Sequence, residues 1–576
     1  MLKQNKQKRK EFQKQLFKAN RLRSCSVMVL SVLGFAVNIL ISLLIKTLAD
    51  YITGENDYAL WQIVLCTVLV LGGFITVSLL RSRVKPKFVK KAMSQYKTHI
   101  FTELTKKNIS SFSRENTGRY ISALTNDAQT IEEYYLEITL QIVTYVMGGI
   151  IAISVMLYFN LILTVAAVVF AFVPLLASIA VGNRFAEKQV EVSEKNETFV
   201  SGVKDWLSGF SVVKSFQAEA EAIQCFDKIN MDLESAKSDG DRMELVINML
   251  TTIASLTSIF GVYFVGAVLA ARGYGLTVGT IIVFANLMNM VNAPLTTVPQ
   301  LWGYRKAACA LMDKLAGLMQ ENIRNEGIRV PAELHAGIRM RDVSFSYVEG
   351  NPVLQGVTQQ FEVGKSYAIV GESGSGKSTL LNVLMGGEDD YVGNIYFDNH
   401  ELKDIDKDSL YDIVTLIQQN VFVFNDTIKH NITMLKDFPQ EEIEKVIHMS
   451  GLDKLIEQKG NNYICGENGS GLSGGEKQRI SIARALLKKA SVLLVDEATA
   501  ALDAVTSYEV THALLSLSNV TRVVITHRLE EGLLELYDEI LVMKNGRIIE
   551  RGTFSGLMEK KAYFYSLFTI TQKQIM

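Results

Sequence analysis

Residues 365–379 read KSYAIVGESGSGKST, and this stretch decides how the second half of the chain folds. The run from Lys365 to Val370 predicts a buried β-strand, and the glycine-rich loop after it has the spacing of a phosphate-binding loop. Its glycines let backbone N–H groups surround phosphate oxygens, and a helix beginning near Lys377 adds its positive end. We expect Lys377 to reach the β and γ phosphates of a nucleotide and Ser378 to coordinate Mg²⁺. The candidate nucleotide-binding residues here are Gly371, Glu372, Ser373, Gly374, Ser375, Gly376, Lys377, Ser378 and Thr379.

A second apolar run, residues 492–495, ends in two carboxylates, Asp496 and Glu497. A continuous apolar strand of this kind is typical of a buried parallel sheet, whose carboxyl edge holds the ligand. Adjacent acids at such an edge would repel each other without a cation. We therefore expect Asp496 to hold Mg²⁺ through water, and Glu497 to polarise the water that attacks the γ phosphate of ATP.

The first half of the chain has a different character, which the overall balance of 59 basic and 60 acidic residues conceals. That balance excludes a disordered chain or a nucleic-acid partner bound by positive charge. Five long stretches contain no Asp, Glu, Lys or Arg: residues 24–45, 58–80, 138–183, 245–271 and 273–304. A spanning helix needs about 20 apolar residues, and the third stretch is long enough for two around a turn at residues 158–160. The sequence therefore predicts six transmembrane helices.

The basic residues predict which side of the membrane each segment faces. Residues 1–23 carry nine Lys or Arg and one acid, and residues 81–137 carry eleven basic residues, whereas residues 46–57 form an expected outside loop with one Lys and three acids. Both termini are then cytoplasmic. The first 23 residues are expected to form a basic helix on the inner membrane surface, not a cleavable signal. Residues 81–137 and 184–244 are expected to form long cytoplasmic helical hairpins.

Residues 472–479 read LSGGEKQR and resemble the signature sequence of ATP-binding cassette (ABC) proteins. Physically, a serine and two glycines at a helix start make a second anion site that phosphate can approach closely. The candidate residues are Ser473, Gly474, Gly475 and Glu476. The resemblance implies that this site completes the nucleotide pocket of the opposite subunit, so that two cassettes sandwich ATP.

Five more positions match the ABC cassette in the family's order, and the resemblance gives each an expected role. Tyr347 would stack on adenine, although a core tyrosine of an edge strand is the alternative. Gln419 would sense the metal and the water, and Glu467 would lie in the loop that touches the hairpin tips. Asp503 would communicate across the dimer, and His527 would contact the γ phosphate. The expected catalytic residues are Glu497, His527 and Gln419, and the expected metal-binding residues are Ser378, Gln419 and Asp496.

The membrane half resembles ABC exporters less specifically, in residues 111–127, 206–219 and 276–280. Three positions depart from the family: Glu476 stands for a commoner glutamine, Ala500 for a serine, and Gln418 for a frequent proline. None of these three changes removes a side chain that would bind phosphate, bind the metal or act as the base, so we expect altered rates at most. Because one chain supplies every motif, the resemblance favours a homodimer with two equal sites, and a pairing with a homologous half-transporter stays open.

The predicted fold class is a multidomain membrane protein with a six-helix all-α transmembrane domain and an α/β P-loop ATPase domain. The expected divisions are a basic helix (residues 1–23), the transmembrane domain (24–304), a linker (305–336) and the nucleotide-binding domain (337–576). The resemblance implies an ATP-driven transporter of the cytoplasmic membrane that uses ATP and Mg²⁺ and works by alternating access in a dimer.

The cargo is less clearly indicated. The predicted spans hold no charged residue deep in the membrane, which favours a hydrophobic or amphipathic molecule: a lipid, a drug-like compound or an apolar peptide. Asn286, Asn289 and Asn292 recur every three residues and are expected on one face of the sixth span, toward the cargo or toward another helix. Export is the expected direction. Import of siderophores, or an ATP-gated channel or regulator, are the alternatives.

Overall fold

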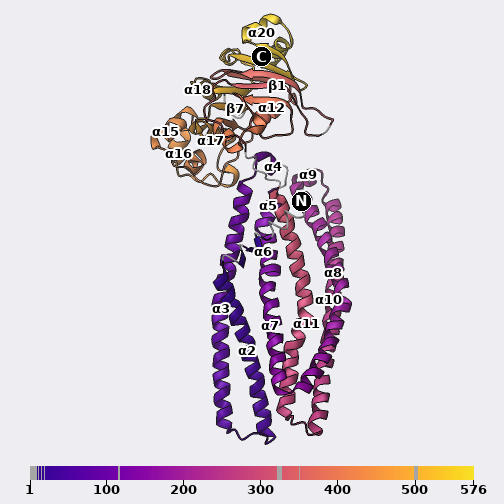
Figure 1. The fold of residues 1–576 in the computed structure, drawn as a ribbon. Coiled ribbons are helices and arrows are strands. Elements are labelled where there is room, and N and C mark those ends of the chain that lie inside the picture. Colours follow the sequence, from indigo (N-terminus) through magenta and orange to yellow (C-terminus); the bar gives the residue numbers. More distant parts are fainter. Residues whose placement is uncertain are drawn as a thin grey trace. The chain divides into compact units, whose positions relative to one another are not determined.

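The computed structural model describes residues 10, 12–14, 16–17, 20–113, 117–320, 327–348, 350–497 and 504–575 (Figure 1). The chain divides into two compact units. The first comprises residues 1–105 and 116–321, and its described elements are all helices. The second comprises residues 106–115 and 322–576 and contains the two β-sheets.

Long helices dominate the described part of the first unit. They are α2 (Arg21–Ile52), α3 (Leu60–Thr105), α7 (Ile138–Phe159), α8 (Leu161–Ser208), α10 (Glu219–Ala271) and α11 (Val278–Gln320). Short helices connect them: α5 (Thr117–Leu124), α6 (Asn126–Ile131), the π-helix η1 (Glu132–Glu137) and α9 (Phe210–Ser215). Five helical stretches of the described chain are long and apolar enough to cross a membrane by length and composition, and α8 begins with a further apolar stretch, Leu161–Ala177. This agrees with the predicted helical membrane domain.

The third charge-free stretch, residues 138–183, divides at Asn160, within the turn that the sequence predicts. The backbone of Asn160 is extended (φ −159°, ψ 119°), so the helix cannot continue through it. Its side-chain oxygen accepts a hydrogen bond from the N–H of Leu163 at 2.9 Å. Asn160 therefore ends α7 and caps the start of α8.

The helices are longer than a bilayer requires. α10 has 53 residues, which at 1.5 Å per residue makes it about 80 Å long, whereas the hydrocarbon core is about 30 Å thick. Much of α10 must therefore extend out of the membrane. α3 and α8 likewise continue to Thr105 and Ser208, so the segments predicted as cytoplasmic hairpins are helical continuations of the spans.

Two helices continue past the points at which the sequence indicated they would end. α2 reaches Ile52, so the loop expected over residues 46–57 is partly helical. α11 reaches Gln320, so residues 305–320, expected at the start of a linker, are helical as well. The reason is visible in α11: Ala308, Met312, Leu315 and Met319 are all buried and recur at helical spacing. Charges at the polar end of a span did not break either helix.

Asp50, near the end of α2, is a buried acid that the loop prediction placed in solvent. It is 3% exposed, and its Oδ1 accepts the backbone N–H of Gly279 in the first turn of α11 at 3.1 Å. Lys46, one turn earlier on α2, contacts Oδ2 at 2.5 Å and lies over the ring of Phe159. A carboxylate is favourable at a helix N-terminus. Asp50 therefore caps α11 from a neighbouring helix.

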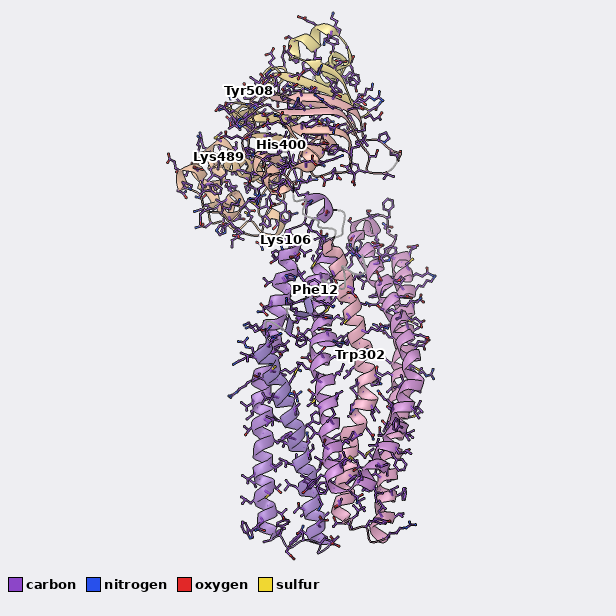
Figure 2. All side chains as sticks on the ribbon, viewed as in Figure 1. Phe12, Lys106, Trp302, His400, Lys489 and Tyr508 are labelled. Atoms are coloured by element: carbon purple, nitrogen blue, oxygen red, sulfur yellow. The ribbon has the colours of Figure 1, made fainter. Side chains whose placement is uncertain are left out.

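The described apolar residues before α2 pack on protein. Phe12, labelled in Figure 2, and Leu16 are buried in one apolar cluster with side chains of α3, η1, α7 and α11. The ring of Phe12 packs edge-to-face with the rings of Tyr96 and His99. Asn20 donates to the side chain of Gln95 at 2.7 Å. The apolar side of this segment therefore faces other helices, whereas the sequence favoured contact with the membrane surface.

The second unit is built on a six-stranded sheet with the order β10-β9-β3-β8-β7-β6. Its strands are β3 (Ser366–Gly371), β6 (Val414–Ile417), β7 (Val492–Asp496), β8 (Thr521–Ile525), β9 (Glu539–Lys544) and β10 (Arg547–Gly552). All neighbours pair in parallel except β9 and β10. The strands β3 and β8 are buried along their whole length, because apolar clusters cover both faces of the sheet. The predicted α/β domain is confirmed.

An antiparallel sheet of order β2-β1-β4-β5 and a set of helices complete this unit. The strands are β1 (Ile338–Phe345), β2 (Leu354–Phe361), β4 (Val392–Phe397) and β5 (His400–Glu401). The helices are α12 (Lys377–Leu384), η2 (Leu402–Asp404), α13 (Lys407–Ile413), α14 (Ile428–Thr433), α15 (Gln440–Met449), α16 (Asp453–Lys459), η3 (Glu467–Gly469), α17 (Gly474–Lys488), α18 (Ala504–Leu515), α19 (Glu531–Leu534), α20 (Phe554–Lys560) and α21 (Tyr563–Ile575).

One short helix of the first predicted hairpin belongs to the second unit. α4 (Ile109–Ser113) lies in the segment 106–115, which clusters with residues 322–576 and not with the long helices. Burial raises the pKa of the Tyr411 hydroxyl on α13. A hydrogen bond with the backbone of Ile109, on α4, acts in the opposite direction and shows that the two helices are in contact. The tip of this hairpin is therefore a packed part of the α/β unit.

The contact between Asp50 and Gly279 generates a stability prediction. A Cβ at Gly279 would lie 2.4 Å from Asp50 Oδ1 and 2.6 Å from the carbonyl oxygen of Lys46. Overpacking of this kind costs about 1–3 kcal/mol, so we expect Gly279→Ala to lower the melting temperature of the purified protein. Gly303→Ala is the matched control on α11, because nothing lies within 4 Å of its added Cβ. Equal melting temperatures for the two variants would contradict the assignment.

Candidate functional site

The phosphate-binding loop joins β3 to α12, as the sequence predicts, and α12 is labelled in Figure 1. β3 ends at Gly371 and α12 begins at Lys377, with Gly376 as its N-cap in a left-handed conformation (φ 97°). A Cβ at Gly376 would lie 2.8 Å from the carbonyl oxygen of Val353, so this position needs glycine for space as well as for φ. The loop therefore delivers the N–H groups of a helix start to one place.

The Lys377 ammonium lies inside this loop. Its Nζ donates hydrogen bonds to the carbonyl oxygens of Gly371 at 2.9 Å and Glu372 at 2.8 Å. Burial lowers its pKa, and the carboxylates of Glu497 and Asp496 oppose that shift. A buried cation at the start of α12 is placed to receive a negatively charged phosphate group.

Asp496, at the carboxyl end of β7, is close to Ser378 on α12. Burial raises the pKa of its carboxyl group, and a hydrogen bond from the Ser378 hydroxyl acts in the opposite direction. Its Oδ1 is buried and has no hydrogen-bond partner among the described residues. An unpaired buried carboxylate oxygen beside a hydroxyl suits a hard cation such as Mg²⁺, which prefers oxygen ligands. The residues present therefore fit the expected metal.

Glu497 is held on both of its carboxylate oxygens. Gln419 Nε2 donates to Oε2 at 2.7 Å, and His527 Nε2 lies 2.7 Å from Oε1. The backbone of Glu497 has a positive φ of 51°, which is uncommon for a residue with a side chain. Strained backbone of this kind is concentrated at functional sites.

The sheet order explains why these three residues meet. Gln419 follows β6, Glu497 follows β7 and His527 follows β8, and these strands are adjacent and parallel. Their carboxyl ends therefore reach the same edge of the sheet, next to β3 and its loop. The structure brings together the residues that the sequence predicted as catalytic and metal-binding.

The signature segment begins α17 (Figure 1). Ser473 is the N-cap, its hydroxyl accepts the N–H of Glu476 at 3.3 Å, and the Glu476 carboxylate accepts the N–H of Ser473 at 2.6 Å. These reciprocal bonds form a capping box. Ser473 and Gly474 are exposed, whereas Gly475 and Glu476 are half-buried. The departure at Glu476 therefore has a structural role at the helix start.

Other predicted residues are placed at the surface of the unit or outside the described chain. Tyr347 is 57% exposed and meets Phe345 edge-on, so it is not a core tyrosine. Glu467 is exposed in η3, and its neighbour Asn468 accepts a hydrogen bond from Lys477 at 2.8 Å. Asp503 and the departure at Ala500 lie outside the described residues, so their roles stay predictions.

Sequence reasoning missed one side chain that reaches the phosphate-binding loop. The hydroxyl of Tyr563, the first residue of α21, lies 2.5 Å from Glu372 Oε1. The two residues are 191 positions apart, so no local spacing could indicate the contact.

Comparison with known proteins agrees with a membrane part and an ATP-binding part in this chain. Residues 24–295 match the ABC transporter transmembrane region, and residues 354–500 match the ABC transporter family. The ATP-dependent lipid A-core flippase of Photorhabdus laumondii is 30% identical over 556 residues, 93% of either chain. That of Vibrio cholerae is 32% identical over 495 residues, covering 83% of this chain and 82% of the relative.

A solved structure shows the same fold. The ATP-bound structure of a bacterial Atm1-family ABC exporter superposes with a TM-score of 0.83 at 22% identity, covering 96% of this chain and 98% of that chain. The matched membrane region and the matched ATP-binding region lie on one polypeptide, in the order that the sequence predicts. This chain belongs to the ABC transporter family and is a membrane-spanning, ATP-hydrolysing transporter.

Proposed function

We propose that this protein exports an amphipathic lipid-like molecule across the cytoplasmic membrane, with both termini in the cytoplasm, as a dimer of two copies. The observation that carries the ATPase part is the convergence of Lys377, Glu497 and His527 at one sheet edge. The proposal of a lipid-like cargo is supported by the relatives named lipid A-core flippase and by the apolar character of the helical unit.

The helical unit contains a hollow of matching chemistry. α7, α8 and α11 border an open space of about 260 Å³ whose lining residues are all apolar, among them Ile150, Phe172 and Leu295. Hydrocarbon is the chemistry that such a lining accepts. Exposed aliphatic and aromatic side chains also continue along the outside of the spans. The apolar lining of the hollow favours a cargo with acyl chains over a charged one.

The three asparagines of α11 are in different environments. Asn289 is exposed, Asn286 is half-buried, and Asn292 is 3% exposed with no partner for its amide among the described residues. The three side chains therefore do not share one environment, although residues three apart are neighbours on a helix. Asn289 is therefore the one we propose for cargo contact.

The proposed hydrolysis starts from the hydrogen bonds around Glu497. When ATP enters, His527 turns from Glu497 Oε1 toward the γ phosphate and Gln419 turns from Oε2 toward the attacking water. The freed carboxylate can then accept a proton from that water. Lys377 stabilises the charge on the transferred phosphoryl group. Ser378, Gln419 and Asp496 would hold Mg²⁺, which would neutralise phosphate charge when bound. Ser473 and its capped helix would bind the ATP of the second copy.

The role of Glu497 is tested by Glu497→Gln, which keeps the shape of the side chain and removes the base. ATP binding should remain, and turnover should fall by about 10²- to 10⁴-fold, the usual contribution of a general base. ATPase assays and nucleotide binding on the purified protein measure the two quantities. Glu535→Gln, at an exposed site on the same unit, is the control. Full ATPase activity in Glu497→Gln would refute the assigned role.

The capping box at the signature makes a graded prediction for Glu476. Glu476→Gln keeps an acceptor for the Ser473 N–H, so ATPase activity should change little. Glu476→Ala removes that acceptor, so the helix start should lose about 1 kcal/mol of stability and ATPase activity should fall. The comparison of the two variants at saturating ATP separates a capping role from a role of the charge. Equal losses in both would show that the carboxylate itself is needed.

Cargo and direction are tested in vesicles containing the purified protein. Lipids with long acyl chains should raise ATPase activity, and a fluorescent lipid should move, only with ATP, out of the leaflet on the cassette side. Asn289→Ala should change the lipid-stimulated rate and leave the basal rate unchanged. Glu497→Gln in the same vesicles is the control for ATP-independent movement. Stimulation by metal chelates, or movement toward the cassette side, would favour the import alternative.

A further inference from the structure

The last described helix, α21, is hydrogen-bonded at both ends to loops of the ATP site. At its start, Tyr563 lies against Glu372 of the phosphate-binding loop. Near its end, Gln572 Nε2 donates to the carbonyl oxygen of Leu529 at 2.9 Å, two residues after His527. No cassette motif of the sequence lies on this helix.

The first end of α21 is held firmly. The Glu550 carboxylate on β10 accepts the backbone N–H groups of Tyr563 at 2.6 Å and of Phe564 at 3.1 Å. Lys544 at the end of β9 lies over the Tyr563 ring, 4.3 Å from its centroid. Burial and the adjacent Glu372 carboxylate raise the pKa of Tyr563 to about 12, so its hydroxyl stays a donor at neutral pH. These contacts fix the direction of the donor toward Glu372.

Glu372 connects this donor to the loop backbone. Its side chain accepts from Tyr563, while its carbonyl oxygen accepts from Lys377 Nζ at 2.8 Å and from the N–H of Ser375 at 3.2 Å. A carboxylate in a triphosphate-binding loop repels its ligand if it can turn inward. The Tyr563 hydroxyl holds the exposed Glu372 carboxylate by a hydrogen bond, which keeps it from turning inward.

The second end of α21 reaches the loop that carries His527. Leu529 is buried in the same apolar cluster as Phe554 and Phe564, so its carbonyl is a firm attachment point. Within that loop, the N–H of Arg528 donates to the hydroxyl of Thr526 at 3.1 Å. Aromatic contacts of Phe564 and Phe568 with Phe554 fix the body of the helix on α20.

We propose that α21 is a brace between the phosphate-binding loop and the His527 loop, and that Tyr563 and Gln572 are positioning residues for ATP binding and hydrolysis. Tyr563 acts through Glu372 on the binding of the phosphates. Gln572 acts through Leu529 on the placement of His527. Because each residue acts on a different loop, we expect Tyr563 to affect KM for ATP and Gln572 to affect kcat.

The decisive variant is Tyr563→Phe, which removes the hydroxyl and keeps the ring that Lys544 covers. Loss of a hydrogen bond to a charged group should raise KM for ATP by about three- to tenfold, while kcat changes by less than about twofold because the hydrolytic residues are untouched. Tyr565→Phe, two residues further on α21, is the matched control and should leave both constants unchanged. If Tyr563→Phe has the same KM for ATP as the control variant, the proposal is wrong.

A double-mutant cycle with Glu372→Ala separates positioning from helix packing. If Tyr563 acts through Glu372, Tyr563→Phe should have no further effect on KM in the Glu372→Ala background. The same rise in KM in that background would show that the tyrosine only stabilises the fold. Melting temperatures of all four proteins check that the cycle compares folded chains.

The other end is tested by Gln572→Met, which keeps the length of the side chain and removes the donor. We expect kcat to fall by about two- to fivefold with little change in KM, since one neutral hydrogen bond is lost and His527 is displaced. An unchanged kcat, or a rise in KM equal to that of Tyr563→Phe, would show that α21 does not act on the His527 loop.

Discussion

Burial of charge at the carboxyl edge of a parallel sheet is the constraint on which the rest of the ATP site depends. Lys377 and Asp496 lie where burial disfavours the ionised form of each, so their pKa values shift in opposite directions. Ionised groups taken out of water are costly unless partners compensate them. Within the protein the compensation is partial, because one oxygen of Asp496 lacks a partner among the described residues. A bound phosphate and a divalent cation would supply what is missing.

The sheet also determines which residues can act together. Gln419, Glu497 and His527 are far apart in sequence, and each follows a different strand of the run β6-β7-β8. Parallel pairing brings their ends to one edge, and the positive φ of Glu497 orients a side chain that would otherwise continue the strand. This backbone conformation of Glu497 costs about 1–3 kcal/mol of strain. The apolar clusters on both faces of the sheet supply the rigidity that holds such a conformation.

The sequence was most informative where chemistry and spacing coincide locally. The phosphate-binding loop, the Asp496–Glu497 pair, the capped start of α17 and the break at Asn160 each follow from a few adjacent residues, and the structure contains all four. Contacts between distant segments gave no such signal. Asp50 and Gly279 are 229 positions apart, and Tyr563 and Glu372 are 191 apart. The helical extent of α2 and α11 was missed for a related reason, because charged residues end a membrane span without ending the helix.

The short helix α4 belongs to the α/β unit but is joined by a short stretch of chain to a long helix of the first unit. α4 packs as part of the α/β unit, yet only residues 106–108 separate it from the end of α3, which is a single helix from Leu60 to Thr105. A helix is stiff along its axis, and three residues can absorb at most about 10 Å of movement when fully extended. A larger displacement of the α/β unit must therefore move α3 or break the packing of α4. Covalent connection thus limits how far α4 can move from the end of α3.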